Sequence, residues 1–130
     1  MKELVLYRCE VCGNFICMVE QSDMVPVCCG RTMHRIEANT EDSAAGEKHV
    51  PVIIEDGTAV RVRVGETEHP SLTNHHIEWI ALLTDRGSYA YALNAGEKPE
   101  AEFRLRVGEE TLAAYAYCNL HGLWVRRTDH

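Results

Sequence analysis

The clearest pattern in the chain is an alternation of apolar and charged residues with a period of two. In AVRVRV (59–64) the valines occupy one face and the arginines the other. AEFRLRV (101–107) repeats this scheme, with Phe103, Leu105 and Val107 on its apolar side. Successive side chains of a strand point to opposite faces, so both segments are predicted to be half-buried β-strands.

Further strands are predicted where short segments are rich in β-branched and aromatic residues. These segments are 50–55, 77–84, 88–93, 112–118 and 123–127. Turn-forming pairs such as Asp56-Gly57 and Ala95-Gly96 separate several of them, and no segment shows a helical apolar stripe. About seven short antiparallel strands predict an immunoglobulin-like β-sandwich, with a small barrel as the competing fold.

The chain is expected to contain two unequal domains. The polar, aperiodic stretch 38–46 predicts a linker, which leaves residues 1–37 as a small first domain and 47–130 as the sandwich. A domain of about 37 residues buries too little apolar surface to be stable alone, so it is expected to need a metal or disulfides.

Composition narrows the classes of function. The chain is 45% hydrophobic and 25% charged, with a formal net charge of −7 and no basic stripe, which argues against nucleic-acid binding. No apolar run approaches the roughly 18 residues that a membrane span needs, and the first ten residues predict no secretory signal. We therefore expect a cytoplasmic protein with no membrane contact, in which clustered thiols serve as metal ligands.

The first 30 residues contain two cysteine pairs, CEVC and CCG. Cys9, Cys12, Cys28 and Cys29 are predicted to form a distorted tetrahedral site for iron or zinc, because adjacent thiolates share one metal only at an unfavourable angle. A purely structural zinc knuckle is the alternative. Cys17 is expected to pack as a small apolar residue, and His34 to lie on the surface.

A second set of metal-binding residue types lies in the larger domain. The segments EKHVP, EHP, NHHIEWI and CNLH place histidines and Cys118 at predicted strand ends or loops, where a sandwich can gather side chains at one rim. One such histidine is more often a satisfied or solvated residue than a ligand. Four imidazoles with one thiolate exceed the four ligands of structural zinc and suit iron with an open sixth position.

These motifs resemble those of the desulfoferrodoxin-type superoxide reductases, and the resemblance extends from residue 7 to residue 125. It implies a desulforedoxin-like first domain with an iron tetrathiolate centre. It also implies an immunoglobulin-like domain with a second, square-pyramidal iron. The implied ligands are Cys9, Cys12, Cys28 and Cys29 for the first iron, and His49, His69, His75, His121 and axial Cys118 for the second.

The resemblance further implies reduction of superoxide to hydrogen peroxide, a role in resisting oxidative stress, a rubredoxin-like electron donor and a homodimer. Lys48 would attract superoxide and support protonation, and Glu47 would occupy the sixth position of the resting iron. Whether calcium also binds is left open. A non-catalytic iron electron carrier and a zinc-stabilised binding module are the alternative functions.

The chain departs from the family pattern at two positions. His76 stands where the family usually has an aromatic residue, and Cys17 is additional. Because neighbouring strand residues point to opposite faces, only one of His75 and His76 is expected to reach the metal. The spacing to IEWI favours His75.

Overall fold

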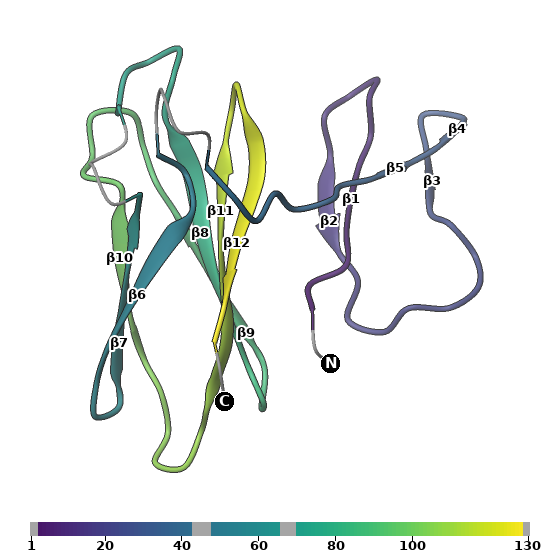
Figure 1. Ribbon diagram of the computed structural model, residues 1–130. Helices are drawn as coiled ribbons and strands as arrows, with labels where there is room; N and C mark the ends of the chain where they lie inside the picture. Colours follow the sequence, from purple (N-terminus) through teal and green to yellow (C-terminus); the bar gives the residue numbers. More distant parts are fainter. Residues whose placement is uncertain (1–2, 43–47, 66–69, 129–130) are drawn as a thin grey trace. The chain divides into compact units, whose positions relative to one another are not determined.

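The computed structural model describes residues 3–42, 48–65 and 70–128, and these divide into two compact units. The first unit covers Glu3–Glu37 and the second begins at Ala38. The described residues contain strands and turns but no helix, and thus no helix that could cross a membrane (Figure 1).

The first unit consists of very short strands. Its three-stranded antiparallel sheet has the order β2-β1-β5, and β3 and β4 form a separate hairpin. The strands are β1 (Leu6–Arg8), β2 (Phe15–Cys17), β3 (Val27–Cys28), β4 (Arg31–Thr32) and β5 (His34–Arg35). Tyr7, Cys9 and Met33 form a small buried cluster in this unit, and Leu4 and Leu6 are also buried, so its core is small, as its length predicted.

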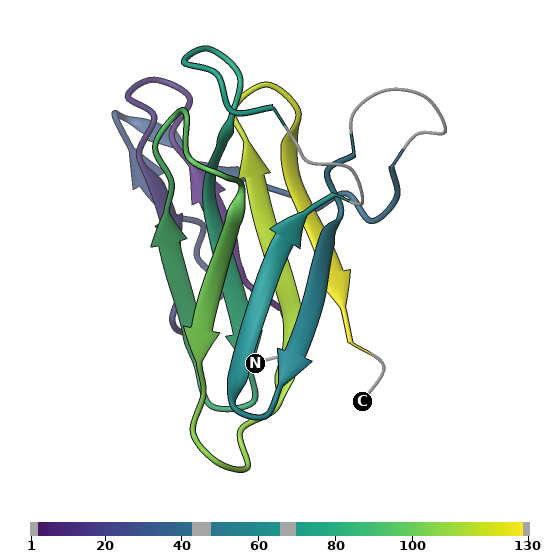
Figure 2. The same ribbon diagram turned by 90° about the vertical axis from the view of Figure 1, so that its left-hand side faces the viewer.

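The second unit is a two-layer antiparallel β-sandwich, as the alternation predicted (Figure 2). One sheet has the order β10-β7-β6 and the other β12-β11-β8-β9. The strands are β6 (Pro51–Asp56), β7 (Ala59–Val64), β8 (Ile77–Thr84), β9 (Ser88–Ala92), β10 (Glu100–Arg104), β11 (Thr111–Cys118) and β12 (Gly122–Arg127). Two separate sheets exclude the small barrel.

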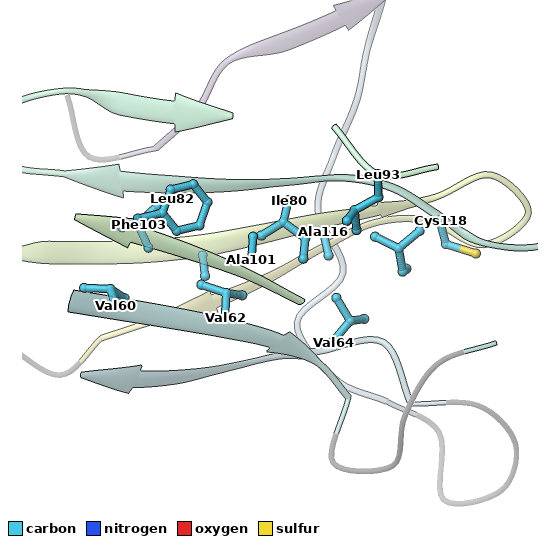
Figure 3. Packing of buried hydrophobic residues seen from close by; sticks show 12 residues of the cluster. Val60, Val62, Val64, Ile80, Leu82, Leu93, Ala101, Phe103, Ala116 and Cys118 are labelled. Atoms are coloured by element: carbon cyan, nitrogen blue, oxygen red, sulfur yellow. The ribbon is translucent and has the colours of Figure 1, made fainter. Parts of the chain in front are cut away.

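Apolar side chains from both sheets fill the space between the layers (Figure 3). Val60, Val62 and Val64 of β7 are each at most 1% exposed, which confirms their predicted inward direction. They pack against residues of β8, β10 and β11. Cys118 lies at one end of this cluster, so the core itself carries a sulfur atom to the rim of the sandwich.

One sequence expectation differs from the structure. Val107 was expected to face the core, but β10 ends at Arg104 and Val107 is 94% exposed, because the chain turns there. Within the stretch predicted as a linker, Asn39 pairs with Trp124 of β12.

A polar network closes the end of the sandwich at which β8 finishes. The Glu109 carboxylate accepts hydrogen bonds from Thr84 Oγ1 at 2.5 Å, Tyr89 OH at 2.7 Å and the Arg106 backbone N–H at 3.0 Å. These donors, Thr84 foremost, hold the pKa of Glu109 below its ordinary value. The hydrogen bond to Glu109 is also the main reason that the pKa of Tyr89 is raised.

Replacing Glu109 with glutamine is expected to lower the free energy of unfolding at neutral pH by about 1 kcal/mol, because amide oxygen accepts more weakly than carboxylate. A lowered folded-state pKa stabilises above the ordinary carboxyl pKa, and this contribution disappears as the pH falls through the folded value. The difference between wild type and variant should therefore shrink on acidification, as measured by urea unfolding. Glu110→Gln, at an exposed neighbour, is the control, and an equal effect there would contradict the role of Glu109.

Candidate metal centres

Four cysteines of the first unit converge in space. Their Sγ atoms all lie within 4.8 Å of one another. Cys12 Sγ is 3.6 Å from Cys28 Sγ, which is 4.0 Å from Cys29 Sγ. Metal–sulfur bonds of about 2.3 Å in a tetrahedron place sulfurs about 3.8 Å apart, so this spacing fits a tetrahedral metal.

Local backbone geometry explains how the two pairs meet. The Cys12 N–H donates to Cys9 Sγ at 3.4 Å, which folds CEVC around one sulfur. In the second pair Cys28 ends β3, and Cys29 and Gly30 both have positive φ, at 53° and 72°. This left-handed turn changes the direction of the Cys29 side chain, so the adjacent thiols of Cys28 and Cys29 both belong to the four-cysteine group. Left-handed backbone is unusual outside glycine, and no local sequence signal predicted it at Cys29.

The thiols of this group also affect one another's ionisation. The Cys12 backbone N–H lowers the pKa of Cys9 to about 6, whereas contact with the Cys12 thiol raises the pKa of Cys29 to about 12. The Cys9 thiol likewise raises the pKa of Cys28. Four sulfurs at this spacing cannot all be anionic without a shared cation, so the donor set itself fits a metal ion.

A second group of donors lies at the rim of the sandwich. His49, His75, Cys118 and His121 place one ligand atom each within 4.8 Å of the others. They come from the segment before β6, the segment before β8, the end of β11 and the β11–β12 turn. In Figure 1 the last three of these elements meet at the same upper end of the sandwich.

The second group combines a buried sulfur atom with a solvent-exposed histidine. Cys118 is fully buried, and its Sγ lies 3.8 Å from His121 Nδ1. The His121 ring packs edge-on against His49 and His75, with centroids 4.9 and 5.1 Å away. His121 itself is exposed, so a small solute can approach this group from solvent. Imidazole and thiolate donors in one cluster suit a transition metal such as iron.

Comparison with known proteins decides the family. The desulfoferrodoxin family model matches residues 41–127. A desulfoferrodoxin homolog of Methanothermobacter thermautotrophicus is 42% identical over 92% of this chain and 94% of its own length. The chain belongs to the desulfoferrodoxin family. The two groups of side chains fit the two iron centres of this family.

Two further relatives extend this similarity over nearly the whole chain. The desulfoferrodoxin of Syntrophotalea carbinolica is 43% identical, with 95% of each chain covered. The crystal structure of the superoxide reductase from Treponema pallidum superposes with a TM-score of 0.84 at 30% identity, covering 98% of this chain and all of that one. Both units therefore have counterparts in the desulfoferrodoxin family.

The remaining predicted site residues fall into three classes. Glu47 and His69 lie outside the described residues. Lys48 is half-buried and directly precedes His49. His76 lies next to the second group but is not part of it, and its Nδ1 is buried with no hydrogen-bond partner among the described residues.

Strand alternation does not separate His75 from His76, because both lie before the strand that was predicted over 77–84. Strand β8 begins only at Ile77, and His75 instead pairs with Leu72 in a tight turn. The two backbone hydrogen bonds of this turn measure 2.8 and 3.1 Å. Turn geometry, rather than strand alternation, thus separates the two imidazoles.

Two residues outside the groups were also considered from the sequence. Cys17 was expected to pack as an apolar residue but is exposed, because β2 is an edge strand of its sheet. His34 lies at the surface as expected, with Nδ1 3.8 Å from Glu10 Oε1.

Asn119 ties the two loops of the second group together, and sequence reasoning missed it. Its Oδ1 accepts from the His76 backbone N–H at 2.9 Å, and its Nδ2 donates to the Asn74 carbonyl at 2.9 Å. These bonds hold the turn that carries His75 against the loop that carries Cys118 and His121. The CNLH spacing identified the two ends of that loop, and nothing in the sequence alone distinguished Asn119 from a spacer.

Proposed function

We propose that this chain is a superoxide reductase, which converts superoxide to hydrogen peroxide with one external electron and two protons. The observation that carries this proposal is the group of three imidazoles and one buried thiol at the sandwich rim of a desulfoferrodoxin-family chain. The relative from Treponema pallidum is itself described as a superoxide reductase.

The ligands follow from the two groups. Cys9, Cys12, Cys28 and Cys29 hold the first iron, and His49, His75, His121 and Cys118 hold the second. His69, outside the described residues, supplies the fourth imidazole. Iron in the second site would supply the one-electron chemistry that superoxide reduction needs. Glu47, outside the described residues, would cover the remaining position in the resting protein.

The protein side chains prepare this site for a small anion. The buried Cys118 sulfur is shielded from water, and its thiolate would donate electron density to a bound iron. Lys48 places a positive charge beside His49 in a chain whose formal net charge is −7. A local cation in an acidic protein raises the encounter rate with an anion and stabilises negative charge as protons arrive.

The electron donor, the assembly state and the location follow the family pattern. We assign a rubredoxin-like protein as donor, a homodimer as assembly and the cytoplasm as location. The small first unit supports a partner surface, because Val19, Met24 and Val27 are 84%, 76% and 68% exposed there. Apolar side chains at this exposure gain stability when a second surface covers them.

The function is tested with the iron-loaded protein and pulses of superoxide under stopped flow. A reductase consumes superoxide with one hydrogen peroxide per superoxide and no release of oxygen. An electron carrier or a zinc-stabilised module would leave superoxide decay at its spontaneous rate, and that result would overturn the proposal. Absorption spectra of the same samples separate the alternatives, because ferric thiolates are coloured and zinc thiolates are not.

Replacing Lys48 with methionine is expected to slow the second-order reaction with superoxide about tenfold, because the local attraction is lost. The rate of the variant should also depend less on ionic strength, since salt screens charges across a Debye length of about 10 Å at 0.1 M. Lys98→Met is the matched control, because Lys98 is exposed and pairs with Glu100 at 3.8 Å. An unchanged rate and salt response in Lys48→Met would remove the steering role.

A further inference from the structure

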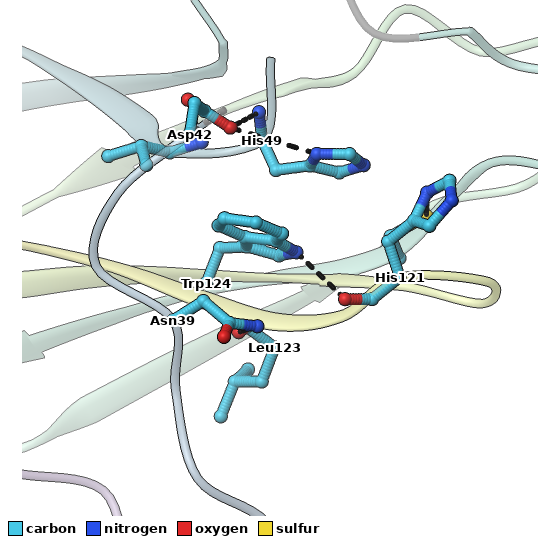
Figure 4. A network of polar contacts seen from close by, with 8 residues as sticks. Asn39, Asp42, His49, His121, Leu123 and Trp124 are labelled. Atoms are coloured by element: carbon cyan, nitrogen blue, oxygen red, sulfur yellow. Dashed lines mark hydrogen bonds and ion pairs between the residues drawn. The ribbon is translucent and has the colours of Figure 1, made fainter. Parts of the chain in front are cut away.

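The first described residues of the second unit are attached to β12. The Asn39 backbone N–H donates to the Leu123 carbonyl at 2.8 Å, and its Nδ2 donates to the same oxygen at 3.1 Å. The Val125 N–H returns a bond to the Asn39 carbonyl at 3.0 Å. These three bonds place Asp42, three residues further along the chain, beside the second group of donors (Figure 4).

Asp42 contacts the backbone and the ring of one proposed ligand. Its Oδ1 accepts from the His49 N–H at 2.6 Å and lies 3.7 Å from His49 Nδ1. Its Oδ2 accepts from the Val50 N–H at 3.0 Å. The side chains of Asp42 and His49 are only 16% and 6% exposed, so water competes little for these contacts.

Trp124 holds the same ring from its face. The Trp124 and His49 rings stack with centroids 4.6 Å apart and planes 12° apart. The Trp124 Nε1–H donates to the His121 carbonyl at 3.1 Å, so the position of the indole is itself tied to a second proposed ligand. Protein groups therefore lie against the His49 ring on two sides, with Trp124 on one face and Asp42 beside Nδ1.

We propose that Asp42 is a positioning residue, which sets the orientation of the His49 imidazole toward the second iron. A carboxylate beside the outer nitrogen of a ligating histidine restricts the rotation and the tautomer of the ring. Because the ring is already oriented, less conformational entropy is lost when the metal binds. This inference rests on the proposed iron site, and it concerns binding and potential of the metal rather than turnover.

The test compares Asp42→Ala with Asp85→Ala in the full, iron-loaded chain. Asp85 is the matched control, because its Oδ1 also accepts a backbone N–H, from Glu110 at 2.9 Å, but at the far end of β8. Release of the second iron to a chelator is followed by the loss of its visible band. The band of the four-cysteine centre in the same molecule is the internal reference.

We expect iron release from the second centre to be about 10–100-fold faster in Asp42→Ala, because loss of an outer partner of a metal ligand lowers metal affinity by about this factor. The reduction potential of this centre should rise, because a nearby negative charge is removed. Asp85→Ala should leave both quantities unchanged. Asp42→Asn, which keeps one acceptor oxygen, should give an intermediate release rate. The same measurements are made on Asp42→Asn if Asp42→Ala does not fold.

The proposal would be overturned if Asp42→Ala were destabilised as much as Asp85→Ala while its iron release and reduction potential stayed unchanged. Asp42 would then only stabilise the loop. Unchanged release in Asp42→Asn together with an unchanged potential would do the same if Asp42→Ala does not fold. Neither readout requires superoxide. A protein that binds the second iron but fails to reduce superoxide would refute the proposed function while leaving the role of Asp42 open to the same measurement.

Discussion

Replacing Cys118 with serine is expected to abolish the visible thiolate band of the second iron and to lower the rate with superoxide at least about a hundredfold. Cys118 is the one sulfur in its group of described donors. A serine hydroxyl is close in size but does not ionise at neutral pH, so it replaces neither the charge nor the electron donation of the thiolate.

The location of Cys118 makes this variant informative. The residue is fully buried at the end of β11 and belongs to the apolar cluster between the sheets, so a small side chain is accommodated there. Circular dichroism should show a retained sandwich, and the band of the first centre should persist. Activity near that of the wild type would contradict the assignment of Cys118 as the sulfur ligand.

Replacing Cys9 with serine is expected to remove the first iron and to unfold most of residues 3–37. The buried apolar cluster of this unit is small and includes Cys9 itself, so we expect a bound metal to supply much of its stability. Structural metal sites in small domains contribute on the order of 10 kcal/mol. Iron content should fall from two atoms per chain to one, and limited proteolysis should cut within this unit.

Cys17→Ser is the matched control for this experiment. Cys17 lies in the same unit, is exposed and is not a member of the four-cysteine group. The Cys17→Ser variant should therefore retain both irons and resist proteolysis as the wild type does. Loss of iron in Cys17→Ser, or its retention in Cys9→Ser, would contradict the proposed ligand set. The band of the second centre should survive in both variants, because its donors all come from the second unit.

The strands of the sandwich could be predicted because their pattern is local. Inward residues of β7 recur every second position, and burial of one sheet face enforces this period. The end of β10 could not be predicted in this way, because AEFRLRV alternates through Val107. The turn that exposes Val107 is closed by Glu109 and Arg106, and it depends on bonds rather than on hydrophobicity.

The metal centres, like the strands, could be predicted from the sequence only in part. Residue types and spacing indicated both sets of donors, and the resemblance to a family selected among them. The left-handed backbone at Cys29 was not foreseen, nor was the turn that brings His75 rather than His76 into the second group. Both depend on backbone hydrogen bonds and dihedral angles that residue types alone do not specify.

The amino-acid sequence by itself determined the strands of the sandwich, the need of the first unit for a metal, and the chemical kinds of donor at two centres. These properties depend on side-chain chemistry and on patterns within a few residues. Only the tertiary structure decided that Asp42, Asn119 and Trp124 lie against residues of the second group and its loops. Asp42 and Trp124 lie 82 positions apart in the sequence (124 − 42), and they meet around His49 because the segment at Asn39 pairs with β12.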